Sequence, residues 1–118
     1  MFKAGGNLIQ ISAGDTGIIR FDVEGVELTG HDRAVFTVKA KSGQVMIRKI
    51  IKPDKADCIM LPFINSDTEK MAPGVYEWDI RIVLKAKLGA NGDVVDGEVI
   101  STPFAPGQFN VIRVVGSI

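Results

Sequence analysis

The chain has 118 residues, of which 46% are hydrophobic and 24% charged, and this composition predicts one globular domain over residues 1–118 rather than a disordered chain. Fourteen basic and fourteen acidic residues give zero formal net charge, which disfavours nucleic acid as the principal partner because phosphate binding usually requires an excess of Lys and Arg. One cysteine excludes an intrachain disulfide, and no apolar stretch has the length of a membrane span or a signal peptide, so we expect a soluble protein from a reducing compartment with no membrane contact.

Alternation of hydrophobic and polar residues predicts a series of short β-strands, because successive side chains of a strand point to opposite faces. A short, flexible, Gly-rich N-terminus over residues 1–6 is expected to precede them. In chain order, the predicted strands cover residues 8–12, 18–24, 33–41, 44–52, 57–64, 75 to about 87, 93–101 and 108–115.

Turn residues join several of these strands into hairpins. Ser42-Gly43 is a tight hairpin signal between the third and fourth strands, and residues 89–92 turn the long strand back on itself. In the fourth strand the alternation slips, because residues 45–47 are all hydrophobic. This slip predicts either a β-bulge or a strand that is covered on both faces.

The most regular alternation lies in the strand that begins near residue 75. Before it, Ser66 and Glu69 have the spacing of a capping box, which predicts one short helical turn near residues 66–71. The Pro-Gly pair that follows ends this turn. The apolar face of the strand consists of Tyr76, Trp78, Ile80, Ile82 and Leu84.

These elements favour an all-β fold. Turns recur every eight to twelve residues, and no segment has the period and length of a long helix. We therefore predict an antiparallel, immunoglobulin-like β-sandwich of about seven to nine strands, with an up-and-down barrel as the alternative.

Residues that could carry chemistry are few. His31 is the only histidine and lies in a Gly-His-Asp loop without a nucleophile motif, so we expect a surface residue rather than a general base. Cys58 lies inside an apolar strand, where a buried small hydrophobe is expected rather than a reactive thiolate. One cysteine and one histidine are too few for a structural zinc site.

Carboxylates give no stronger signal. Asn91, Asp93 and Asp96 form a loose fragment of a calcium-binding loop, but a hairpin turn explains them better because the order of ligands is incomplete. Glu77 and Asp79 share the polar face of one strand, as solvated residues of a half-buried strand commonly do. We predict that the protein is not an enzyme and has no catalytic, cofactor-binding or metal-binding residues.

Two strands, 44–52 and 57–64, carry hydrophobic residues on both faces. A small sandwich has one interior, so the second face is covered either by a loop or by another subunit. Zero net charge also removes a barrier to self-association. The candidate interface residues are Met46, Ile50, Cys58, Met60 and Ile64.

The order of short motifs along residues 8–114 resembles the N-terminal β-sandwich domain of the tailed-phage baseplate upper protein family. The motifs are Gly14-Asp15-Thr16 leading into Phe21-Asp22-Val23, then Ala34-Val35-Phe36-Thr37-Val38-Lys39, Asp67-Thr68, Pro73-Gly74-Val75-Tyr76-Glu77-Trp78-Asp79-Ile80 and Gly107-Gln108-Phe109-Asn110-Val111. The resemblance implies a non-catalytic structural protein of a phage or prophage virion, in the tail or baseplate. Its implied partners are other virion proteins and further copies of itself, and its implied location is the virion, after assembly in the host cytoplasm.

Two other functions remain open at this point. A carbohydrate-binding module that recognises a host-surface glycan would need exposed aromatic rings, for which Tyr76 and Phe104 are the candidates. An immunoglobulin-like adhesin or accessory domain of a longer surface protein is the weaker alternative.

Overall fold

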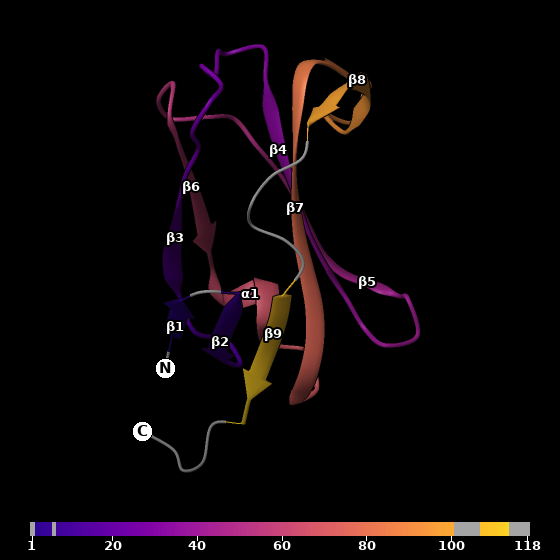
Figure 1. The fold of residues 1–118 in the computed structure, drawn as a ribbon. Helices are drawn as coiled ribbons and strands as arrows, with labels where there is room; N and C mark the ends of the chain where they lie inside the picture. The colour runs from indigo at the N-terminus through magenta and orange to yellow at the C-terminus, as the bar shows by residue number, and fades with distance from the viewer. Residues whose placement is uncertain (1, 6, 101–106, 114–118) are drawn as a thin grey trace.

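The computed structural model describes residues 2–5, 7–100 and 107–113, and its regular secondary structure consists of β-strands and one four-residue helix (Figure 1). This confirms the predicted all-β fold. Each of the eight predicted strands is present, although residue 101 and residues 114–115 of the predicted ranges lie outside the described residues. The elements are β1 (Phe2–Gly5), β2 (Leu8–Ser12), β3 (Gly17–Asp22), β4 (Arg33–Lys39), β5 (Val45–Ile51), β6 (Cys58–Phe63), α1 (Asn65–Thr68), β7 (Gly74–Leu88), β8 (Val94–Ile100) and β9 (Gly107–Ile112).

The strands form two layers. Sheet A has seven strands in the order β1-β2-β9-β7-β4-β5, with β8 paired to β7, and sheet B consists of β3 and β6. Figure 1 shows sheet B on the left and the strands β4, β7 and β5 of sheet A on the right, with β1 and β2 of sheet A at the lower left. Within the described residues β3 and β6 hydrogen-bond as strands only to each other, so the sheets do not close into one ring. The molecule is therefore a sandwich, and the barrel alternative is wrong.

One strand pair in sheet A is parallel, whereas the sequence predicted an antiparallel fold. β2 runs parallel to β9, with Ile9 opposite Phe109 and Ile11 opposite Val111. The other pairs are antiparallel. Alternation predicts that a segment is a strand, but it carries no information about the direction of its neighbour.

The N-terminal segment is also different from the prediction. Residues 2–5 form β1, which pairs antiparallel with β2, rather than a flexible end before the first strand. The Phe2 ring reaches across to sheet B, where its centroid lies 5.8 Å from that of Phe63. Gly17 makes room for it, because a Cβ at that position would lie 2.6 Å from the Phe2 ring. A short, Gly-flanked segment thus becomes a strand through a contact that is remote in sequence.

The slip in β5 is a β-bulge, as one of the two predicted alternatives required. Val38 lies opposite Ile47 and Lys39 lies opposite Val45, which leaves Met46 as the extra residue. The hairpin between β4 and β5 turns at Gly43, whose φ of 90° is in the left-handed region.

The helical turn is shorter than predicted and begins one residue earlier. Its cap is not the Ser66–Glu69 pair: the Ile64 N–H donates to the Asp67 carboxylate at 2.8 Å, so the predicted capping box is wrong. The reason lies in the tertiary structure, since Thr68 is fully buried and its hydroxyl accepts the Gly14 N–H at 3.0 Å. Burial of Thr68 therefore determines which residues form the helical turn.

Aromatic rings form the centre of the core. Trp78 stacks on Phe36 with the centroids 5.8 Å apart, and its ring lies 6.0 Å from that of Phe21 on the opposite sheet. The Tyr76 hydroxyl donates to the Ala72 carbonyl at 2.6 Å, which is the tyrosine corner of immunoglobulin-like sandwiches. In antibody domains the residue two positions after this tyrosine is a disulfide-bonded cysteine. Here Trp78 stands two residues after Tyr76, and its contact with Phe21 joins the two sheets.

Candidate interaction surface

The five predicted interface residues do not share one surface. Ile50 lies opposite Val35 on the outward face of sheet A, the face turned away from sheet B, while Met46 packs against the core. Cys58 is 2% exposed, so it presents no surface to a partner, and its predicted burial is confirmed. Met60 lies on the outward side of sheet B, and Ile64, the residue that directly follows β6, is exposed.

Two further hydrophobic residues, Ile18 and Pro62, lie on the outward side of sheet B. Ile18 lies opposite Pro62 across β3 and β6, and Met60 lies opposite Arg20. Ile18 is 61% exposed and Ile64 is 56% exposed, Pro62 is exposed and Met60 is partly buried. We call Ile18, Met60, Pro62 and Ile64 the β3–β6 patch. Because Ile18 is out of phase with the inward residues of β3, the alternation of the sequence could have identified it.

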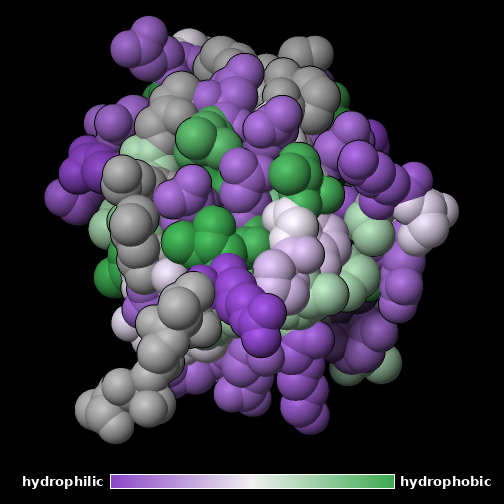
Figure 2. Space-filling model, turned by 90° about the horizontal axis from the view of Figure 1, so that it is seen from below, coloured by the Kyte–Doolittle hydropathy of each residue, from purple (hydrophilic) through white to green (hydrophobic). Residues whose placement is uncertain are grey.

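Exposed hydrophobic residues also occur elsewhere. Viewed from the lower end of Figure 1, the molecule shows several green hydrophobic areas between purple polar ones (Figure 2). The exposed large hydrophobic residues of the described chain are all aliphatic: Leu8, Ile18, Val45, Ile64, Val75, Leu88, Val95 and Val99. Tyr76 and Trp78 are buried, so neither ring can stack on a sugar, and Phe104 lies outside the described residues.

The outward face of sheet A is partly covered by the chain itself. Val35 and Val83 are buried there although they point away from sheet B. Gly97 of β8 lies directly on Val83, since a side chain at Gly97 would overlap it. At the turn before β8, Asp93 forms an ion pair with Arg48 of β5 at 2.9 Å. The β7–β8 hairpin therefore supplies part of the cover that the hydrophobic face required.

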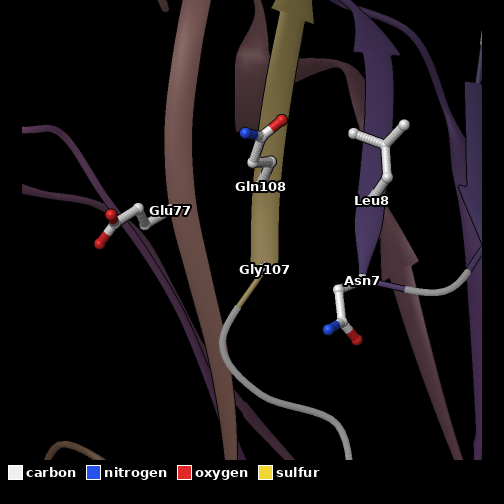
Figure 3. Close-up of a pocket in the computed structure, with 5 residues that line it drawn as sticks. All are labelled: Asn7, Leu8, Glu77, Gly107 and Gln108. Atoms are coloured by element: carbon white, nitrogen blue, oxygen red, sulfur yellow. The ribbon is translucent and has the colours of Figure 1, made fainter.

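A shallow hollow lies at the end of β2 and β9. It has a volume of about 500 Å³ and is lined by Asn7, Leu8, Glu77, Gly107 and Gln108. Figure 3 shows Leu8 and Gln108 on neighbouring strands, while Glu77 points away from both. The hollow offers two amides and one carboxylate that do not converge, so it has no arrangement of acid, base and nucleophile.

The acidic turn before β8 uses its oxygens internally. The Asn91 side-chain oxygen accepts the Asp93 N–H at 3.1 Å, and the Asp93 carboxylate accepts the Val94 N–H at 2.8 Å. The hydrogen bond from Arg48 holds the pKa of Asp93 below its usual value. Within the described residues no cluster of three or more His, Cys, Asp or Glu side chains is placed to hold a metal ion. Turn geometry thus accounts for these residues.

His31 and its neighbour Asp32 have different environments. His31 is exposed in a loop, as predicted. Asp32 is 4% exposed, and its two oxygens accept the backbone N–H groups of Thr29 at 2.7 Å and Lys85 at 3.0 Å. Lys85 has a left-handed φ of 49° at the irregular part of β7. The Asp32 carboxylate therefore fixes a bend in the backbone and belongs to no paired acid–base arrangement.

Comparison with known proteins gives no assignment: no protein-family model matches the chain, and no curated protein matches it. In the part of the chain that the structure describes, no helix has the length and hydrophobicity needed to cross a membrane.

Proposed function

We propose that this protein is a non-catalytic structural component of a phage or prophage virion, which joins the tail or baseplate through protein–protein contacts. Two kinds of observation support the proposal. Most of the ordered motifs that resemble the baseplate upper protein family lie in strands of a β-sandwich, while Gly14-Asp15-Thr16 forms the turn before β3 and Asp67-Thr68 belongs to α1. The β3–β6 patch exposes hydrophobic side chains, and their burial by a partner would stabilise the complex.

The patch is the observation that carries the proposal. Ile18 of β3 and Ile64, which directly follows β6, are more than half exposed, while the inward residues of both strands are buried in the core. Full burial of one such side chain contributes about 1.5–3 kcal/mol, so covering the patch favours association even where few polar contacts are made. Arg20 and Asp22 border the patch and provide the polar rim that interfaces usually have.

The site chemistry also favours a binding role over catalysis. His31 is exposed in a loop, Cys58 is buried, and the carboxylates of Asp32 and Asp93 are bonded to backbone groups. Catalysis by side chains requires an oriented base beside a nucleophile or a pair of converging carboxylates.

The test is whether the protein enters particles through the patch. Tagged protein is produced in the host cells that make the virion, and particles are purified on a density gradient and probed for the tag. We expect the wild type in the particle fraction and a strong loss of Ile18→Glu and Ile64→Glu. Val99→Glu is the matched control, because Val99 is similarly exposed, at 58%, but lies on β8.

Two results would contradict the proposal. If folded wild-type protein is produced but is absent from the particles, the virion assignment fails. If both patch variants enter particles as well as the wild type, the patch is not the docking surface.

A further inference from the structure

Within the described residues, one edge of the strand β3 is not paired with another strand. On its inner edge, Val23 just beyond the strand donates to the Asp57 carbonyl at 2.8 Å, which continues the ladder with β6. Residues that exchange hydrogen bonds in an antiparallel ladder recur at every second position, so these are the odd-numbered ones. The backbone N–H and C=O groups of Ile18, Arg20 and Asp22 therefore point away from β6.

The opposite edge of sheet B, on β6, is blocked at each position. The Met60 N–H donates to the Asp54 carboxylate at 3.0 Å, Cys58 forms an isolated bridge with Lys55, and Pro62 has no N–H. Side-chain caps and prolines of this kind prevent an edge strand from pairing with another chain.

The edges of sheet A are blunted in other ways. β5 has a bulge at Met46 and turns the charged Lys49 inward, toward the Phe63 ring. β1 is only four residues long, and the pairing of β8 with β7 contains two register shifts. Among the edge strands that the structure describes, β3 has no bulge, proline or side-chain cap on its free edge.

We propose that β3 pairs antiparallel with β3 of a second copy of this chain, around a two-fold axis at Phe21. This inference rests on the proposed function, in which the protein assembles through protein–protein contacts, and it names a second copy of the chain as one partner. In this register the outward backbone groups of Arg20 face those of Asp22 of the second copy, and the reverse pair forms by symmetry.

Charge selects this register. With the axis at Phe21, each Arg20 side chain lies opposite an Asp22 side chain, and opposite charges directly across a pair are favourable. With the axis at Arg20 or at Asp22, the residue on the axis would face its own copy, which is unfavourable for like charges. Arg20 and Asp22 already contact each other within one chain at 2.7 Å, and both side chains are more than half exposed, so they can exchange partners.

The product would be a four-stranded sheet in the order β6-β3-β3-β6. Its outward face brings the two β3–β6 patches onto one sheet and roughly doubles the hydrophobic surface available to other virion proteins. The pairing edge itself is short, so the dimer is expected to be weak, with a Kd on the order of 0.1 mM in isolation, and to be favoured at the high local concentration of an assembling particle.

The experiment is sedimentation equilibrium of purified protein from about 5 μM to about 1 mM, a range that brackets the expected Kd. Wild type is expected to show a monomer–dimer equilibrium. Arg20→Asp and Asp22→Arg each place like charges opposite one another, so each is expected to dimerise at least tenfold more weakly. An equimolar mixture of these two variants restores opposite charges and is expected to recover dimerisation, as is the double variant with the charges exchanged.

Arg81→Asp is the matched control, because Arg81 is an exposed arginine beside Asp79 on β7, away from the free edge. It is expected to dimerise as the wild type does. Far-UV circular dichroism and thermal unfolding check that every variant is folded, and recovery in the mixture shows independently that both single variants are intact.

The inference is overturned if the wild type remains monomeric up to the highest concentration. It is also overturned if the wild type dimerises but none of these charge changes alters the dimer Kd. Failure here is distinct from failure of the proposed function. If the protein is monomeric but still enters purified particles, only the proposed β3 dimer is contradicted. If it forms the charge-dependent dimer but is absent from particles, only the virion assignment is contradicted.

Discussion

The backbone carbonyl of Asn7 accepts a hydrogen bond from the indole Nε1 of Trp78 at 3.1 Å. The same oxygen accepts the Gln108 N–H at 3.0 Å. Through this one acceptor, the segment before β2 is joined to β9 and to the central ring of the core. Gly107 makes the approach feasible, because a side chain there would overlap the Asn7 carbonyl and press on the Trp78 ring.

Gly107→Ala should therefore destabilise the protein. The added methyl group meets backbone rather than a flexible side chain, so β9 or the Asn7 segment must shift, and we expect a loss of about 2–4 kcal/mol in the free energy of unfolding by urea. Gly30→Ala is the control, since among the described residues its new Cβ would have only the flexible end of Lys52 within 4 Å. A loss in Gly30→Ala as large as that in Gly107→Ala would contradict this account.

Tyr76→Phe removes the hydroxyl of the tyrosine corner while keeping the ring. The lost hydrogen bond to the Ala72 carbonyl is expected to cost about 1 kcal/mol of unfolding free energy. Ala72 is exposed, so water can replace the hydroxyl and limits the loss. The midpoint of thermal unfolding checks this prediction, and an unchanged midpoint would show that the corner adds no stability.

Lys49 of β5 and Asp67 of α1 form an ion pair, with Nζ and Oδ2 2.9 Å apart and both side chains less than one-fifth exposed. Lys49→Met leaves the Asp67 carboxylate in a partly buried place without its cation, and we expect a loss of about 1–3 kcal/mol. A double-mutant cycle with Asp67→Asn isolates the pair. Additive effects of the two changes in urea unfolding would mean that the pair contributes nothing beyond its separate groups.

The carboxyl of Asp93 should titrate below its usual pKa of 3.8, because the side-chain hydrogen bond from Arg48 stabilises the charged form. A lowered pKa in the folded state makes this contribution to stability complete above pH 3.8, and it is lost as the pH falls through the folded-state pKa. Carboxyl-detected NMR titration should show the pKa of Asp93 rising in Arg48→Gln. The Val94 N–H keeps part of the shift, so a complete return to 3.8 is not expected.

The sequence by itself determined the strands other than β1, and it determined the buried side of those strands in which hydrophobic and polar residues alternate regularly. Tyr76, Trp78 and Ile80 alternate with polar residues, and their burial follows because a strand has a period of two wherever it lies in the fold. The hairpin at Gly43 was predictable for a similar reason, since a tight turn is specified by the residues within it.

Only the tertiary structure decided which strands are neighbours and in which direction they run. The parallel pairing of β2 with β9, the recruitment of β1 into sheet A and the earlier start of α1 all depend on contacts between residues far apart in the sequence. The predicted interface residues lie on different faces because tertiary structure also decides which strands form each face. Ile50 and Met60 are similar in their local patterns, but β5 belongs to sheet A and β6 to sheet B, so they face opposite sides of the sandwich. Alternation is a property of one strand, whereas a surface is made by the strands that pack beside it.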